Sequence, residues 1–392
     1  MPHAVIVDVV RTPSGRGKPG GALSAIHPID LAAHVLTALL ERNGLESRQI
    51  DDVLMGCVSQ VGDQAMNIAR HAVLAAGFDE TVPAVTIDRQ CGSSQQAAHF
   101  AAQGVIAGAY DIVIAAGVES MSRVPLGSSR VGGTKAPGLV RRYPDGLVNQ
   151  GVSAELIAQK WDFSREQLDA YSAESHRRAA EAWNRGAFDS QVLPVLAGGS
   201  DAVAFDETVR AGTTAESLAA LKPAFRTDEL ATRFPDLDWR ITAGSSSPLT
   251  DAASAALIMS EEKATELGLT PRARFHSFAV VGDDPIMMLT GPIPATRRIL
   301  ERSGLSIGDL DAYEVNEAFA SVPLAWQRDL DADPAKLNPW GGAIALGHAV
   351  GASGTRLLGT LVAHLEATGG RYGLQTMCEG GGMANATIIE RL

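Results

Sequence analysis

Cysteine is scarce in this sequence, and nothing in it predicts a membrane anchor or a secretion signal. The three cysteines, Cys57, Cys91 and Cys378, are an odd and widely spaced set in 392 residues, unlike the disulfide framework of a secreted domain. Residues 1–8 predict a short strand and lack the basic segment and apolar run of a signal peptide. No uncharged apolar stretch is long enough to cross a bilayer. We therefore expect a reducing, cytoplasmic location and no membrane partner.

Positive charge is also in short supply. The 33 lysines and arginines are outnumbered by 45 aspartates and glutamates, which gives a net charge of −12. This balance argues against nucleic acid or an anionic membrane as the main partner, so an anionic substrate would need a local basic patch. Hydrophobic residues make up 45% of the chain, as in a globular protein, and the length predicts at least two domains.

Two segments of the chain resemble each other at a constant spacing of 260 residues. Residues 39–52 and 299–312 share six identities in fourteen positions, and each predicts a helix that ends at glycine before an apolar strand. The same spacing aligns residues 91–94 with residues 351–354, and both segments begin a predicted helix. Chance similarity between two amphipathic helices is the alternative, but the matching turns favour an internal duplication.

Strands and helices alternate in each half, which predicts an α/β fold with largely parallel sheets. In the first half, residues 84–88 and 112–115 predict strands on either side of a helix at 93–108. That helix consists largely of Ala, Gly, Ser and Gln without a charged face, so we expect it to be buried. In the second half, residues 352–366 predict the equivalent helix, and residues 374–377 predict the strand that follows.

The region between the halves, residues 120–241, has a different composition. Residues 121–144 contain five basic residues, no acid and much Gly, Pro and Ser, which predicts a loop. This loop could contact phosphate, mediate subunit contacts or be solvated. Residues 164–185 predict a capped helix, and the polar residues 226–240 predict a surface excursion.

Three residues in glycine-rich turns are candidates for covalent chemistry. Cys91 lies at a strand-to-helix junction, where exposed backbone amides favour thiolate over thiol; a buried apolar cysteine is the alternative. His348 lies in a turn whose glycines permit close backbone approach. Cys378 ends a predicted strand before a glycine run that lacks the lysine and hydroxyl residue of a phosphate-binding loop but can present amides to an oxyanion. A metal site is disfavoured, because two cysteines and one histidine lack a fourth ligand.

Two further segments allow more than one interpretation. Asn316 and Glu317 follow a predicted strand, where they could orient a water or a histidine, or Asn316 could simply cap a helix. Residues 245–247 are a run of serines that predicts a turn before a helix beginning at Asp251.

Taken together, these blocks resemble the thiolase family. The resemblance spans the whole chain in the right order, and its motifs are Cys91–Ser94, Asn316–Phe319, Gly341–Gly354 around His348, and Cys378–Gly382, supported by Val118–Arg123. It implies a duplicated βαβαβαββ core, built from layers of helices and two mixed sheets, with an inserted loop domain. The implied division is an N-terminal core half at 1–119 plus about 242–268, a loop domain for CoA and acyl binding at 120–241, and a C-terminal core half at 269–392.

The resemblance also implies an activity. The expected enzyme is an acetyl-CoA C-acyltransferase that cleaves a 3-ketoacyl-CoA with CoA through an acyl-Cys91 intermediate, or runs the reverse Claisen condensation. Cys91 would be the nucleophile, His348 its activator, and Cys378 the general acid and base. Asn316 would hold a water that forms one oxyanion site with His348, and the amides of Cys91 and Gly380 would form the other.

The resemblance implies that CoA and acyl-CoA are the substrates and that no cofactor or metal is permanently bound. It also implies a homo-oligomer, either a dimer or a tetramer. The residues that resemble the family's CoA contacts by position are Arg210, Ser217, Phe225, Ala243, Ser247, Ala318 and Phe319.

Several positions depart from the family's pattern. Ser94 and Ala384 replace glycines, and Ala349 replaces a proline after the histidine, which puts the local loop geometry in question. Asn149 and Gln150 stand where short-chain biosynthetic members often have His-Met, which favours a degradative enzyme with a larger acyl group.

Four alternative functions stay open. The nearest is an acetyl-CoA C-acetyltransferase that acts on acetoacetyl-CoA. A ketoacyl synthase is weaker, because those relatives usually have a histidine where Cys378 stands. A non-catalytic, lipid-binding relative would be expected to lose one of the three reactive residues, and none is lost here. Finally, Cys91 and Cys378 could form a thiol redox switch.

Overall fold

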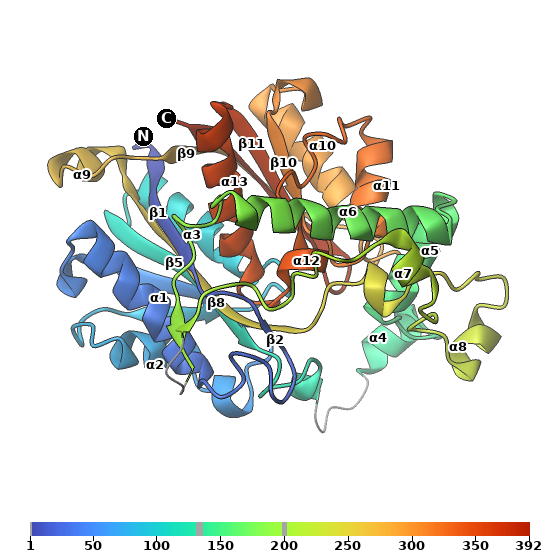
Figure 1. Cartoon of the computed structure of the whole chain (residues 1–392). Helices are drawn as coiled ribbons and strands as arrows, with labels where there is room; N and C mark the ends of the chain where they lie inside the picture. Colours follow the sequence, from blue (N-terminus) through green and yellow to red (C-terminus); the bar gives the residue numbers. More distant parts are fainter. Residues whose placement is uncertain (1, 131–135, 198–201) are drawn as a thin grey trace.

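The structure is a computed structural model that describes residues 2–130, 136–197 and 202–392. Within these ranges the strands form one large mixed sheet and one two-stranded hairpin, with helices packed around the sheet (Figure 1). None of the helices in the described ranges combines the length and the apolarity that crossing a membrane requires.

The large sheet runs through both halves of the chain. Its strands are, in spatial order, β10 (Ala312–Val315), β11 (Tyr372–Glu379), β12 (Met383–Arg391), β9 (Ala273–Gly282), β1 (Ala4–Arg11), β8 (Thr250–Ser260), β5 (Ile112–Ser120), β3 (Asp52–Gly56) and β4 (Ala84–Ile87), with β2 (Gly15–Arg16) beside β8. Only three of these neighbouring pairs are parallel: β3 with β4, β3 with β5, and β10 with β11. The expectation of largely parallel sheets is therefore wrong, because the central strands pair antiparallel.

The two halves of the sheet share one strand order. Outward from the junction, β1–β8–β5–β3 and β9–β12–β11–β10 each contain two antiparallel pairs followed by a parallel pair. This common order is what an internal duplication would produce. The halves join through only two residue pairs, Val5 with Arg274 and Ile6 with Ala273, so the two expected sheets are sections of one.

Helices form three layers around the two sheet sections. The first section shares a core with α1 (Pro28–Asn43) and α2 (Ile68–Ala75). The second shares a core with α10 (Pro292–Ser303) and α11 (Ser321–Asp329). The central pair, α3 (Ser93–Ile106) and α13 (Ser353–Thr368), packs with strands of both sections. The central helices contact each other, and their many small residues are buried, as predicted for the helix at 93–108. Gly354 permits this approach, because a Cβ there would lie 2.1 Å from the backbone N of Gln95.

The predicted repeat of helix, glycine and strand is confirmed. Helix α1 ends at Gly44, which has a φ of 62°, and α10 ends at Gly304, which has a φ of 73°. Both glycines take the left-handed conformation that commonly closes a helix at little steric cost. The strand that follows each cap, β3 or β10, then enters the sheet.

The region between the halves contains more helix than the sequence indicated. Its elements are α4 (Pro137–Arg142), α5 (Gln150–Lys160), α6 (Arg165–Asn184), the hairpin β6 (Val195–Leu196) and β7 (Ala202–Val203), α7 (Ala215–Ala219) and α8 (Asp228–Arg233). The predicted helix at 164–185 is confirmed as α6. The loop expected at 121–144 includes α4, which starts at a proline suited to the first helical position, and residues 131–135 of that loop lie outside the described ranges. The excursion at 226–240 includes α8.

The predicted type of one element is wrong. The segment beginning at Asp251 is not a helix but part of β8, an eleven-residue strand buried along its whole length. Its alanines favour helix locally, but β1 and β5 pair with it on both sides. A strand buried on both faces shows no alternation of polar and apolar residues, so no strand period is visible in this segment. The short helix α9 (Glu261–Glu266) follows it.

Candidate active site

The candidate catalytic residues lie where strands end and helices begin. Cys91 lies between β4 and α3, and His348 follows α12 (Ala343–Leu346) shortly before α13. Asn316 directly follows β10, and Cys378 is the penultimate residue of β11. Because β10 and β11 are parallel neighbours, Asn316 and Cys378 lie at the same edge of the sheet. All four side chains are buried.

These side chains converge on one place. Cys91 and Cys378 lie near enough for charge on Cys91 to raise the pKa of Cys378. The backbone N–H of Gly380 lies close enough to the Cys91 thiol to lower its pKa. Asn316 Nδ2 lies 3.4 Å from His348 Nε2. Cys91 also shares a buried apolar cluster with Val350, two residues after His348, which brings the Cys91 motif of the first half next to the motifs of the second.

Hydrogen bonds determine which ring nitrogen of His348 carries the proton. His348 Nδ1 lies 2.6 Å from Ser353 Oγ, and that hydroxyl donates to the carbonyl oxygen of Ala349 at 2.9 Å. Because its hydrogen is used there, Ser353 Oγ accepts from Nδ1–H, and Nε2 keeps its lone pair. Burial, and then the positive charge of Arg356, lower the pKa of His348 to about 3. The imidazole is therefore neutral near pH 7 and can accept a proton at Nε2.

Both thiols hold their protons in the free site. Burial, and then the negative charge of Glu379, raise the pKa of Cys91 to about 12. The backbone N–H groups of Cys91 and Gly380 and the side chain of Gln150 act in the opposite direction. Burial also raises the pKa of Cys378 well above its ordinary value. The expectation that the helix start keeps Cys91 as a thiolate is thus wrong, because desolvation outweighs the amides, and each thiol needs a base before it reacts.

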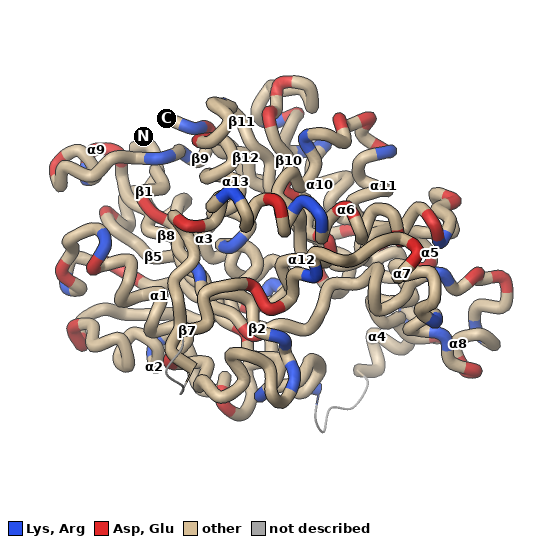
Figure 2. The backbone as a smooth tube through the Cα atoms, in the orientation of Figure 1, with Lys and Arg blue, Asp and Glu red and all other residues tan. Residues whose placement is uncertain are grey.

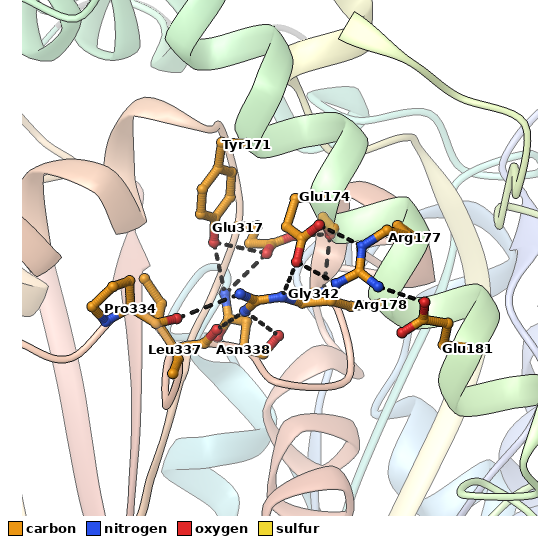
Figure 3. A network of polar contacts seen from close by, with 12 residues as sticks. Tyr171, Glu174, Arg177, Arg178, Glu181, Glu317, Pro334, Leu337, Asn338 and Gly342 are labelled. Atoms are coloured by element: carbon orange, nitrogen blue, oxygen red, sulfur yellow. Dashed lines mark hydrogen bonds and ion pairs between the residues drawn. The ribbon is translucent and has the colours of Figure 1, made fainter.

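A buried carboxylate next to Asn316 holds this part of the site in place. Glu317 accepts four hydrogen bonds: from Tyr171 Oη at 2.9 Å, Ser175 Oγ at 2.7 Å, Asn338 Nδ2 at 3.0 Å and the backbone N of Ile344 at 3.1 Å. Figure 3 shows Glu317 and Asn338 facing Tyr171 and the charged residues of α6. These bonds tie α6 to the segments that carry Asn316 and His348. The helix-cap alternative for Asn316 is wrong, because α11 begins at Ser321 with Ala320 as its cap.

A second buried carboxylate joins the two halves. Glu119, in β5, accepts from the backbone N of Val58 at 2.9 Å, the backbone N of Ser59 at 3.0 Å, and Gln64 Nε2 at 2.8 Å. Its Oε2 also accepts from the backbone N of Gly351 at 3.0 Å. The turn between His348 and α13 is therefore held by a carboxylate of the first half.

Part of the proposed CoA-binding set lies together. Ser247 donates through its backbone N and its Oγ to the carbonyl oxygen of Ala318, at 3.0 Å and 3.1 Å. The ring centroid of Phe319 lies 5.6 Å from that of Phe225. Phe225 fits against Gly151, where a Cβ would lie 2.1 Å from its ring. These residues lie together between β10 and α5, with Ala318 and Phe319 buried and Phe225 packed against them.

The other three members of that set are exposed. Arg210 donates through its backbone N to His176 Nδ1 at 3.2 Å, and Ser217 is the third residue of α7, where its backbone N and side chain complete the helix cap with Thr214. Ala243 begins a short 3-10 turn. No hydrogen bond or ion pair within the described ranges joins Arg210 to Phe225, Phe319, Ala318 or Ser247. Figure 2 shows basic residues interspersed with acidic ones across the molecule, including around α8.

Sequence reasoning missed several residues that act on the site. Ser353 orients His348, and Glu379 lies buried beside both cysteines. Gln150, which the sequence indicated only as a specificity position, lies near enough to the Cys91 thiol to lower its pKa. The position of Ser353 in the first turn of the predicted helix after His348 was an available signal. Across the part of the chain that the structure describes, no group of three or more His, Cys, Asp or Glu side chains is arranged to hold a metal ion.

Known proteins match the chain along its whole length. The family model described as "Thiolase, N-terminal domain" matches residues 4–262, and the model described as "Thiolase, C-terminal domain" matches residues 269–391. A steroid 3-ketoacyl-CoA thiolase (FadA6) of Mycobacterium tuberculosis is 46% identical over 401 residues, covering 100% of this chain and 95% of that protein. A 3-ketoacyl-CoA thiolase of Serratia proteamaculans is 44% identical over 400 residues, covering 100% of both chains.

A solved structure agrees with these matches. The crystal structure of the Bacillus anthracis acetyl-CoA acetyltransferase superimposes with a TM-score of 0.88 at 38% identity, covering 100% of this chain and 99% of that one. The fold class and the enzyme class predicted from the four motifs are thereby confirmed. The chain belongs to the thiolase family.

Proposed function

We propose that the protein is an acetyl-CoA C-acyltransferase in which Cys91, His348 and Cys378 carry the reaction. One observation supports this most directly: the Cys91 and Cys378 thiols, which both hold protons, are buried next to each other, and Cys91 packs in one cluster with Val350, two residues from a neutral imidazole whose Nε2 carries no proton. Such a set can form an acyl-cysteine with one sulfur and transfer a proton at carbon with the other.

The reaction begins with proton transfer from Cys91 to His348 Nε2. The thiolate adds to the ketone carbon of a 3-ketoacyl-CoA, and the bond between Cα and Cβ then breaks to leave acyl-Cys91 and the enolate of acetyl-CoA. Cys378 protonates that enolate. Its raised pKa suits it to a strongly basic carbon, and such a group typically contributes ~10²–10⁴-fold.

The second half of the cycle returns every proton. The Cys378 thiolate takes the proton of incoming CoA, and the CoA thiolate attacks acyl-Cys91 to give the shortened acyl-CoA. Cys91 leaves as a thiolate and recovers its proton from His348. The amides of Cys91 and Gly380 would stabilise one oxyanion, and Asn316, through a water, would stabilise the other with His348, each donor contributing ~10²–10³-fold.

Mass spectrometry of the trapped acyl-enzyme tests these roles. We expect a 3-ketoacyl-CoA to add its shortened acyl group to the Cys91 peptide, and Cys91→Ala to abolish the adduct. Cys378→Ala should still accept an acyl group from an acyl-CoA but lose cleavage of 3-ketoacyl-CoA. Cys57→Ala is the matched control, because it removes a buried thiol that belongs to a different hydrophobic cluster from Cys91 and Cys378. Normal thiolysis by Cys378→Ala would overturn its role.

We also propose a degradative enzyme for acyl groups larger than acetyl. Gln150 at the Cys91 thiol and relatives named 3-ketoacyl-CoA thiolase and steroid 3-ketoacyl-CoA thiolase support this. The second candidate is an acetyl-CoA C-acetyltransferase, the name of the structural neighbour. Thiolysis rates over acetoacetyl-CoA, long-chain and steroid side-chain thioesters distinguish the two, and a preference for acetoacetyl-CoA would favour the second.

The remaining elements of the proposal concern binding and assembly. CoA would lie along Ser247, Ala318, Phe319 and Phe225, with Ala243, Ser217 and Arg210 at its phosphate end, and without a permanent cofactor. We also propose that the chain divides into the loop domain at 120–241, the C-terminal core half at 269–392, and an N-terminal core half made of the remaining residues. We expect a cytoplasmic homo-oligomer. Its assembly is supported by β4, which within the described strands has a partner on one side only, and by the exposed Val85 of that strand. Light scattering would measure the oligomeric state.

A further inference from the structure

Glu379 is a fully buried carboxyl group that the reaction above does not use. It is the last residue of β11, and because strand residues alternate between faces, its side chain lies on the face opposite to that of Cys378. Neither of its oxygens has a hydrogen-bond partner among the described residues. Buried carboxyl groups are nearly always hydrogen-bonded, so this one calls for an explanation.

The carboxyl group lies against the backbone of the nucleophile turn. A Cβ added to Gly92, the residue after Cys91, would lie 2.1 Å from Glu379 Oε1 and 2.9 Å from its Cδ. Asn385, from the adjacent strand β12, donates to the carbonyl oxygen of Gly92 at 3.0 Å. Glycine at position 92 therefore leaves the space that the Glu379 carboxyl group fills, at the entry to α3.

The charges facing Glu379 are those of Arg89, Asp88 and the two cysteines. Burial raises the pKa of Glu379 to about 8, the charge of Arg89 opposes this, and that of Asp88 adds to it. No ion pair joins Arg89 to Glu379 in the described ranges, although Arg89 lies near. A negative charge on Glu379 in turn raises the pKa of Cys91 and that of Cys378.

We propose that Glu379 is a positioning residue that controls the ionisation of Cys91: its neutral carboxyl group permits the thiolate to form, and its carboxylate opposes it. The inference rests on the proposed role of Cys91 as the nucleophile. Two like charges that are buried close together disfavour each other. A negative charge on either Glu379 or Cys91 therefore makes ionisation of the other less favourable. Loss of the Glu379 proton near pH 8 therefore makes the nucleophile harder to activate.

The test is the rate of Cys91 alkylation by iodoacetamide between pH 6 and 10, followed on the Cys91 peptide by mass spectrometry. The rate follows the thiolate fraction and rises tenfold per pH unit below the pKa of the thiol. In the native protein this rise should flatten near pH 8, as Glu379 ionises. In Glu379→Gln the rate should keep rising tenfold per pH unit. The variant should therefore react about tenfold faster than the native protein at pH 9.5, which corresponds to a difference of one unit in the pKa of Cys91.

The matched control is Glu314→Gln, which removes a buried carboxyl group on β10 whose pKa is also about 8 but which does not act on Cys91. It should keep the flattening near pH 8. A uniform change in rate at every pH in Glu379→Gln would indicate a purely structural role and overturn the proposal. If Glu379→Gln fails to fold, the native profile decides, because a straight rise through pH 8 also overturns it. Failure of the acyl-enzyme experiment would instead refute the role of Cys91.

Discussion

Removing the hydroxyl group of Ser353 should slow the enzyme by weakening its base. Ser353 Oγ lies 2.6 Å from His348 Nδ1 and donates to the carbonyl oxygen of Ala349. It is the contact that keeps the proton on Nδ1 and the lone pair on Nε2. Ser353→Ala leaves Nδ1–H buried without an acceptor, and the ring is then free to adopt the tautomer that cannot accept a proton from Cys91.

The size of the effect follows from the cost of the lost contact. A buried donor left without a partner costs about 1–3 kcal/mol. If that cost appears in the transition state, where the imidazole becomes charged and the contact is strongest, each ~1.4 kcal/mol is a factor of ten. We therefore expect kcat to fall roughly 5- to 150-fold, with a much smaller change in KM, because Ser353 lies behind the imidazole and not against CoA.

Single-turnover acylation, measured as the appearance of acyl-Cys91 after rapid mixing with a 3-ketoacyl-CoA, isolates the affected step. Ser254→Ala is the matched control. It removes a buried hydroxyl that donates to the carbonyl oxygen of Ala352 at 2.6 Å without touching the imidazole, so acylation should stay within about twofold of the native rate. An unchanged acylation rate in a well-folded Ser353→Ala would refute the argument that this contact sets the tautomer.

Three further outcomes concern stability, each measured by denaturant unfolding. Arg11→Met should cost about 3–5 kcal/mol, because Asp206 loses both of its buried bonds to Arg11, at 2.7 Å and 2.9 Å; a loss below about 1 kcal/mol would contradict this. Gly44→Ala, at a φ of 62°, should destabilise by about 1 kcal/mol or more, whereas Gly212→Ala, in open space, should not. Burial raises the pKa of Glu155 to about 7 from 4.5. Its contribution is therefore present below pH 4.5 and lost as pH rises through 7, by up to about 3 kcal/mol at ~1.4 kcal/mol per pKa unit, and Glu155→Gln should lack this loss.

The features that could be predicted from the sequence are those that depend on residues close together in the chain. The helix ends at Gly44 and Gly304 were predictable because few other residues tolerate a left-handed cap. The buried helix at 93–108 was predictable because its face carries no charge. The motifs around Cys91 and His348 were recognisable because their residue types and order are specific to one family, although each motif alone is weak.

What the sequence could not provide is the effect of distant residues. Strand β8 was predicted as a helix because alanine favours helix, whereas its neighbours β1 and β5 determine its conformation. The Cys91 thiol was expected to be ionised from its place at a helix start, yet burial and Glu379, 288 positions away along the chain, raise its pKa. The hydrogen bond from Gly351 to Glu119 likewise crosses the halves and leaves no local pattern.

The narrow junction between β1 and β9 has a consequence for how the enzyme could be divided. Two residue pairs link the strands of the halves, and α3 of the first half lies against α13 of the second. Cys91 lies just before α3, and His348 lies five residues before α13. A protein cut near residue 268 should therefore give two inert pieces whose reassociation restores turnover, and a bulkier residue at Gly354 should prevent that recovery, because it would separate nucleophile from base.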